Sequence, residues 1–216
     1  MRFIENLGRL NAAHPWSHND AYLGFVLRQA RAVRRRGGTT AVDVGCGTGS
    51  LLSRLATSFP RVTGIEQDAE TARLAAQRFA GSTTVTILHR SFGEEPAQAY
   101  DLIAFVASLH HLSLHRALER ARHALRPGGR IVIVGVAAET RSDVFRSLAS
   151  MLLNPLVGLI RHPRRATGTP PHMRAPTAQP HESFREIQRI ARAVLPGIRM
   201  RRRLFWRYTA VWTAPE

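Results

Sequence analysis

The sequence predicts an α/β protein: a doubly wound sheet of seven strands, mostly parallel, that ends in an antiparallel hairpin. Short apolar runs alternate with helix-like segments over residues 39–136, as expected for parallel strands joined by crossover helices. Two further apolar runs near the C-terminal end are separated by so few residues that a tight hairpin is favoured. A chain of 216 residues is long enough for one such domain and too short for two ordinary ones.

The predicted strands are short apolar runs bounded by turn signals. They cover residues 41–44, 61–66, 85–88, 101–106, 130–136, 198–205 and 208–213. The predicted helices carry apolar residues at intervals of three and four. They cover residues 51–57, 70–79, a shorter piece near Glu94, 114–125, 145–160 and 183–195. Ser113 is placed to cap the helix over 114–125, and Pro127 with the two following glycines ends it.

We expect a single domain, residues 1–216, in four segments. These are a helical cap at 1–38, the core at 39–136, an insertion or lid at 140–181, and the last helix with the hairpin at 182–216. The longest apolar stretch, residues 148–160, is broken by Asn154 and Pro155 and is shorter than the roughly 18 residues that span a bilayer, so no transmembrane helix is expected. A single cysteine cannot form an internal disulfide, so a reducing cytoplasm is the expected compartment.

The positive charge of the chain lies in its flanks. All 31 basic residues are Arg, set against 15 acidic residues, which gives a formal net charge of +16. Residues 41–140 carry 10 Arg and 9 acids, whereas residues 141–216 carry 14 Arg and 4 acids. Because a complete Arg-for-Lys replacement indicates compositional bias, the high charge is weak evidence for a nucleic-acid partner. Nucleic acid therefore stays possible without being favoured.

The most informative segment is residues 42–50, where a strand runs into a glycine-rich turn and then a helix. Gly45, Gly47 and Gly49 allow a tight turn and let a ligand approach the N-terminus of the helix. Position 50 is Ser, so the spacing differs from the dinucleotide fingerprint and argues against a nicotinamide cofactor. Glu66 ends the second strand, where an acid can accept both hydroxyls of a ribose. The ligand is thus expected to carry a ribose.

These residues resemble the class I S-adenosylmethionine-dependent methyltransferases, of the bacterial small-molecule type, over roughly residues 15–213. The matching segments are residues 43–49, Glu66, 100–103 with 107–112, and 125–129. The resemblance implies a Rossmann-like sheet and S-adenosyl-L-methionine as the cofactor, with S-adenosyl-L-homocysteine as the product. Metal binding is not expected, because the ten histidines are scattered without the close acidic or cysteine spacing of a zinc site.

The resemblance also implies which residues bind the cofactor. Asp43 and the glycine turn would hold the methionine part, Glu66 the ribose, and Gln67 would flank the adenine, while the backbone at Ala107 would touch the cofactor. After the third strand this chain has Arg90-Ser91-Phe92 where many relatives have an Asp for the adenine amino group, so Ser91 or the backbone would serve instead. The expected cofactor-binding residues are Asp43, Gly45, Cys46, Gly47, Gly49, Glu66, Gln67, Ser91, Phe92 and Ala107.

Three residues are candidates for a catalytic part. Methyl transfer needs in-line positioning of the acceptor more than it needs an acid or a base, so few catalytic residues are expected. His110 and His111 follow the fourth strand, where substrate meets cofactor; either one would act as a base, or both would only shape the helix cap. Tyr22, in a segment that begins at His14, would contact the cofactor carboxylate or anchor the first helix to the sheet. Cys46 is interpreted as structural, although some relatives use a cysteine nucleophile.

The insertion bears on the substrate. Its apolar residues between Phe145 and Leu159 are followed by Arg161, Arg164 and Arg165. We rank a lid over an apolar substrate first, a dimer interface second and attachment to a membrane surface third. The expected function is methyl transfer to a small-molecule acceptor with an apolar body. The alternatives are an RNA or protein methyltransferase that uses the basic flanks, and a noncatalytic cofactor-binding module.

Overall fold

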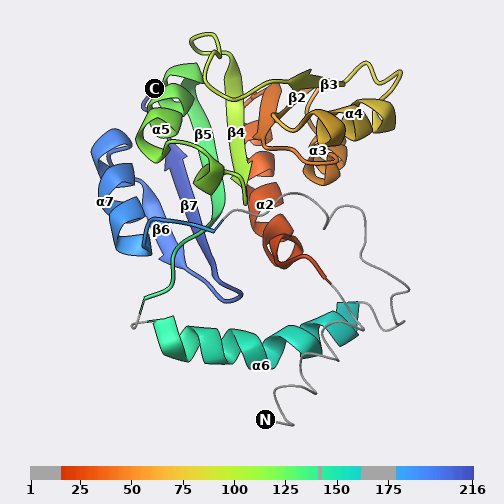
Figure 1. The fold of residues 1–216 in the computed structure, drawn as a ribbon. Helices are drawn as coiled ribbons and strands as arrows, with labels where there is room; N and C mark the ends of the chain where they lie inside the picture. Colours follow the sequence, from red (N-terminus) through yellow and green to blue (C-terminus); the bar gives the residue numbers. More distant parts are fainter. Residues whose placement is uncertain (1–15, 141–142, 162–178) are drawn as a thin grey trace.

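The computed structural model describes residues 16–140, 143–161 and 179–216, and it places all seven strands in one twisted sheet (Figure 1). The strand order is β3-β2-β1-β4-β5-β7-β6, in which the first five strands are parallel. β7 runs antiparallel to both β5 and β6. The predicted fold class, a mostly parallel Rossmann-like sheet with a C-terminal antiparallel pair, is confirmed.

The strand bounds differ from the prediction mainly at two places. The strands are β1 (Thr40–Val44), β2 (Arg61–Glu66), β3 (Val85–His89), β4 (Tyr100–Val106), β5 (Leu125–Val136), β6 (Arg199–Arg202) and β7 (Arg207–Thr213). β5 begins at Leu125 because this residue already pairs with Tyr100. β6 is shorter than predicted because Phe205 and Trp206 both have a φ of +56° and belong to the turn before β7.

The helices are η1 (His18–Tyr22), α2 (Leu23–Arg35), α3 (Ser50–Leu55), α4 (Ala69–Arg78), η2 (Leu109–His111), α5 (Leu114–Ala124), α6 (Val144–Arg161) and α7 (Phe184–Val194). The short helix predicted near Glu94 is absent from this described stretch, and that prediction was wrong. The buried carboxylate of Glu95 instead accepts a hydrogen bond from the Gly93 amide at 2.9 Å and pairs with Arg90 at 2.7 Å. These bonds hold the segment as an irregular turn.

Helices cover both faces of the sheet because successive strand residues point to opposite sides. In β4, Ile103 and Phe105 pack with α5 and α7, whereas Leu102 and Ala104 pack with α2 and α3. Two apolar cores result, one on each face, and the carboxyl ends of the parallel strands remain open as an edge between them.

α6 follows β5 and lies across the molecule beyond this edge of the sheet (Figure 1). Its hydrogen bonds to the rest of the chain run to the N-terminal segment, to the turn between β6 and β7 and to Glu139 after β5. No helix within the described ranges combines the length and the apolar character needed to cross a bilayer.

Candidate active site

The glycine-rich turn after β1 is folded tightly against its neighbours. The amides of Gly45 and Cys46 both donate to the carbonyl oxygen of Ile65, at 2.8 and 3.1 Å. Gly45 has a φ of +69°, and a side chain there would overlap the Cβ of Ser108. Gly49, with a φ of +83°, is the N-cap residue of α3. Glycine is therefore required at 45 both for its backbone angle and for its close approach to the end of β4.

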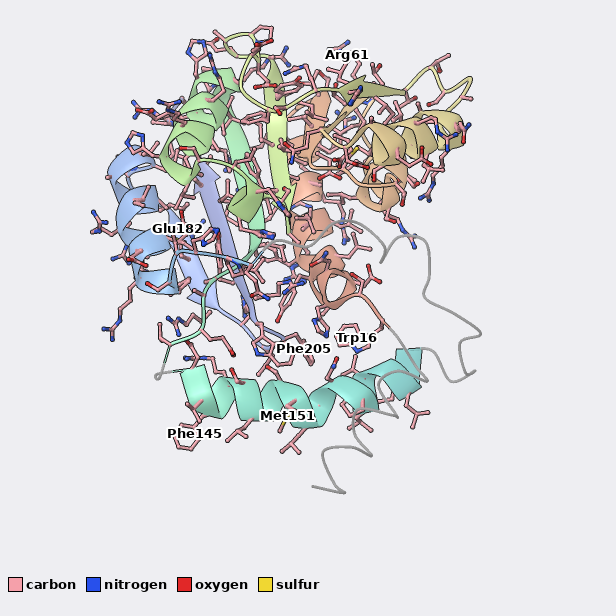
Figure 2. The ribbon with its side chains drawn as sticks, in the orientation of Figure 1. Trp16, Arg61, Phe145, Met151, Glu182 and Phe205 are labelled. Carbon is pink, nitrogen blue, oxygen red and sulfur yellow. The ribbon has the colours of Figure 1, made fainter. Side chains whose placement is uncertain are left out.

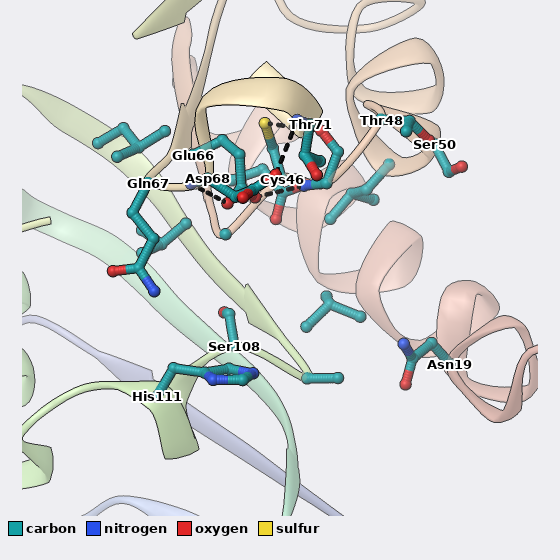
Figure 3. A pocket seen from close by; sticks show the side chains of 18 of the residues that line it. Asn19, Cys46, Thr48, Ser50, Glu66, Gln67, Asp68, Thr71, Ser108 and His111 are labelled. Carbon is teal, nitrogen blue, oxygen red and sulfur yellow. Dashed lines mark hydrogen bonds between the residues drawn. The ribbon is translucent and has the colours of Figure 1, made fainter. Parts of the chain in front are cut away.

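A cavity of about 280 Å³ lies at the carboxyl ends of β1, β2 and β4, where the glycine turn, the N-terminal segment and η2 meet (Figure 3). It collects most of the predicted site residues. Those that line it are Asp43, Gly45, Cys46, Gly47, Glu66, Gln67, Ser91, Phe92, Ala107 and His111. The predicted residues Gly49, His110 and Tyr22 do not line it.

Asp43 is the most unusual group in this cavity. Its side chain is only 2% exposed, and within the described residues its Oδ1 atom has no hydrogen-bond partner. Burial, and secondarily the nearby Glu66 carboxylate, raise the pKa of Asp43 to about 8. A buried oxygen without a partner is costly, so the site is built to receive a donor or a cation from a ligand.

Glu66 joins the end of β2 to the glycine turn. Its Oε2 accepts from the Gly47 amide at 2.9 Å, and its Oε1 accepts from the Asp68 amide at 3.0 Å. Each carboxylate oxygen has a further lone pair, so a ligand hydroxyl can still donate to it. Beside it, the Ser91 hydroxyl lies 3.4 Å from Oε1 of Gln67, which links the predicted adenine-side residues of β2 and β3.

The turn after β4 carries Ser108, a residue that was not among the predicted site residues. Ala107 has a φ of +55°, unusual for a residue with a side chain, and its amide donates to the Val134 carbonyl at 2.7 Å. This turn points Ser108 into the cavity, where the buried hydroxyl has no partner among the described residues. Asp43 and Ser108 thus give the same cavity two buried polar atoms without partners. The position of Ser108, next to the strand end, was the available signal.

The N-terminal segment closes the cavity on a second side. Ser17, Asn19 and Asp20 line it, and none of them was singled out from the sequence. Arg207 holds Asn19 in place, because its Nε donates to Oδ1 of Asn19 at 3.1 Å. The Tyr22 hydroxyl donates to the Leu204 carbonyl at 2.7 Å, so this residue anchors the N-terminal helices to the turn between β6 and β7. His14 lies outside the described residues.

The two histidines after β4 differ in their position relative to the cavity. Their ring centroids lie 4.1 Å apart, but only His111 lines the cavity. Figure 3 shows the His111 ring beside Ser108, across the cavity from Glu66. A base at this position can reach a group bound in the cavity, which makes His111 the better placed of the pair.

Cys46 is buried in the glycine turn. Burial above all, with the carboxylates of Asp43 and Glu66, raises the pKa of this thiol above its ordinary range. A protonated thiol is a poor nucleophile, which agrees with a structural part for Cys46. Within the described ranges no group of His, Cys, Asp and Glu residues is arranged to hold a metal ion.

The sheet, the glycine turn and the acidic residue at the end of β2 define an α/β enzyme that binds a nucleoside-derived cofactor at the carboxyl edge of its strands. The family model for the methyltransferase domain matches residues 42–131. An uncharacterized methyltransferase of Mycobacterium tuberculosis is 31% identical over 204 residues, which cover 93% of this chain and 98% of the relative. The chain belongs to the S-adenosylmethionine-dependent methyltransferase family.

Two further comparisons agree with this membership. The crystal structure of a SAM dependent methyltransferase from Aquifex aeolicus superposes with a TM-score of 0.55 over 97% of both chains, at 19% identity. The ubiquinone biosynthesis O-methyltransferase of Serratia proteamaculans is 27% identical over 129 residues, or 57% of this chain and 52% of that protein. The chain is an enzyme whose cofactor is S-adenosylmethionine.

Proposed function

We propose that this methyltransferase acts on a small molecule with an apolar body. The observation that carries the proposal is the lining of the cavity: next to its polar groups stand Leu23, Val26, Phe92 and Leu112. These side chains favour an acceptor that presents an apolar surface.

The residues present fit the cofactor. The unpartnered Asp43 carboxylate and Ser108 hydroxyl are suited to the amino and carboxylate end of the methionine part, while Glu66 is suited to the ribose hydroxyls. Gln67 and Ser91 lie further along the cavity wall, where the adenine would be held. When bound, the cofactor supplies a sulfonium methyl group, which passes to the acceptor as the bond to sulfur breaks and S-adenosylhomocysteine is formed.

His111 is our candidate for the base, because it is the histidine that reaches the cavity. It would accept the proton that an acceptor hydroxyl or amine loses as its bond to the methyl carbon forms. The protein otherwise contributes mainly alignment: the N-terminal segment and the turn after β4 enclose the reactants from two sides. Such positioning can supply roughly 7–11 kcal/mol of the barrier.

One basic cluster lies at the edge of the sheet that is remote from the cavity. Arg35, Arg36 and Arg199 lie close enough to Arg130 that, after burial, their charges lower its pKa. This cluster surrounds the start of β5 and the end of α2, at the edge of the sheet opposite to the cavity. A nucleic acid bound there would be held away from the methyl group. One relative is named for O-methylation in ubiquinone biosynthesis.

The test is to incubate the enzyme and methyl-labelled cofactor with an extract of the source cells and to partition the label into small-molecule, RNA and protein fractions. We expect label in the small-molecule fraction. Asp43→Asn is the blank, and Glu70→Gln, which removes an exposed carboxylate paired with Arg73 outside the cavity, is the matched control that should retain activity. Label confined to RNA or protein would refute the small-molecule proposal, and cofactor binding without any transfer would favour the noncatalytic module.

A further inference from the structure

α6 turns its apolar side away from the protein. Phe145, Leu148, Leu152, Leu156 and Leu159 recur at intervals of three and four and form one stripe of the helix. All are exposed, Phe145 by 87% of its surface, and Figure 2 shows this ring pointing away from the body of the molecule. Among the described residues, the only large apolar side chain exposed outside α6 is Leu74.

The side of α6 that touches the protein mixes polar and apolar residues: Ser150, Asn154 and Pro155 are buried, and Met151 and Val157 are half-buried. The buried Ser150 hydroxyl accepts a hydrogen bond from the Phe205 amide at 2.8 Å. The side-chain oxygen of Asn154, also buried, accepts from Trp16 Nε1 at 2.9 Å and lies 2.9 Å from Nε2 of His18. Rolling the helix to bury its apolar stripe would break these bonds and leave buried polar groups without partners. The outward orientation is therefore fixed by the structure.

The sequence of α6 and of the residues that follow it is strongly cationic. From Val144 to His181 the sequence holds five Arg and no Asp or Glu. Asp143, just before the helix, is paired with Arg202 within the protein. An exposed apolar stripe within a cationic stretch of sequence complements a surface that is apolar inside and negatively charged at its rim. A second copy of the same cationic segment would repel it, which disfavours a dimer through this face.

We propose that α6 is an interfacial helix that binds an anionic membrane surface, with its apolar stripe among the acyl chains and its arginines at the headgroups. Its 18 residues would lie in the plane of the interface over about 27 Å. Trp16 and His18, which contact Asn154, flank Ser17 in the cavity wall, so the bound surface lies next to the active site. The inference does not require the acceptor itself to come from the membrane.

The test is cosedimentation of the full chain with vesicles, either phosphatidylcholine alone or phosphatidylcholine with an equal part of phosphatidylglycerol. We expect binding to the mixed vesicles that is at least tenfold tighter than to the neutral ones and that weakens in 0.5 M salt. The double variant Leu152→Ser with Leu156→Ser should lose at least tenfold in affinity for the vesicles, because each substitution removes an apolar side chain that would be buried among the acyl chains. Leu74→Ser, exposed on α4, is the matched control and should bind like the unaltered protein.

Absence of vesicle binding by the unaltered protein, or equal binding by the double variant, would overturn the inference. A dimer in light scattering that the double variant abolishes, together with no vesicle binding, would assign the face to a second copy instead. Circular dichroism and S-adenosylhomocysteine binding should be unchanged in the double variant, since neither leucine touches the cavity. A failure of membrane binding is thereby distinguishable from a failure of the proposed methyl transfer.

Discussion

Replacing Asp43 by Asn should stabilise the ligand-free protein while weakening cofactor binding. The side chain is buried, and its pKa is raised to about 8 by burial and by Glu66. In the unfolded chain an Asp ionises at about pH 3.9. Between these two values the folded protein keeps a proton that the unfolded chain has lost, so its stability falls as the pH rises from about 4 towards 8.

The size of this effect follows from the two pKa values. With about 1.4 kcal/mol for each pH unit above the unfolded pKa, Asp43 costs the folded state about 4 kcal/mol at pH 7. Asn has nearly the same shape and does not ionise. The free energy of unfolding of Asp43→Asn, measured in urea, should therefore exceed that of the unaltered protein by up to about 4 kcal/mol at pH 7 and by little at pH 4.

Cofactor binding should also depend on the protonation state of Asp43. If the ligand requires ionised Asp43, the dissociation constant of S-adenosylhomocysteine should fall about fifty-fold between pH 6 and pH 8, as a group with a pKa of about 8 loses its proton. Calorimetry in buffers of different ionisation enthalpy should detect the released proton at pH 7. Asp43→Asn should bind more weakly and release none.

A difference in unfolding free energy between the two proteins that does not change from pH 4 to pH 7 would refute this reasoning. So would cofactor binding by Asp43→Asn with undiminished affinity, because it would show that the unpartnered oxygen does not face the ligand. Glu70→Gln again serves as the control, since its exposed carboxylate lies outside the cavity.

Four other substitutions test the site and the sheet that carries it. Gly45→Ala should lower the free energy of unfolding by about 2–4 kcal/mol and abolish cofactor binding. A φ of +69° and an overlap with Ser108 both oppose a side chain at this position. Near-normal stability in urea would contradict the turn geometry. His111→Ala should lose about 10²–10⁴-fold in turnover with unchanged cofactor affinity, whereas His110→Ala should stay active; the reverse result in steady-state kinetics would exchange their parts. Asp101→Asn should destabilise the protein by about 1–3 kcal/mol at pH 7. Burial raises the pKa of Asp101, but hydrogen bonds to its carboxylate, chiefly from Thr40, outweigh burial and lower the pKa. In urea unfolding, the difference in unfolding free energy between the variant and the unaltered protein should vanish as the pH falls below about 4.

The cofactor half of the site could be predicted from the sequence because it depends on local features. Gly45 and Gly47 adopt left-handed backbone angles that glycine tolerates best, and Glu66 stands at the end of a strand whose bounds were predicted residue for residue. In a parallel sheet, such strand ends meet at one edge whatever the details of packing. Local spacing and topology together were enough to bring these residues to one cavity.

The acceptor side could not be predicted in the same way, because it depends on side-chain direction and distant contacts. The sequence placed His110 and His111 together, but only the turn at Ala107 and the short helix after it decide which ring enters the cavity. Tyr22 had two interpretations, and only the structure shows that its hydroxyl donates to the carbonyl of Leu204, 182 residues further on. No sequence periodicity indicates a contact between residues so far apart in the chain.

α6 shows the same difficulty at the level of a whole helix. The apolar residues of this segment predicted a helix, and the usual expectation is that the apolar side of a helix faces the core. Here Ser150 and Asn154 face the protein instead, because they accept hydrogen bonds from the Phe205 amide and from Trp16 Nε1. The sheet has already closed both of its apolar cores without α6, so the helix has no core face to fill. Its apolar stripe is left exposed as a result, and this exposure is the observation on which the proposed membrane binding rests.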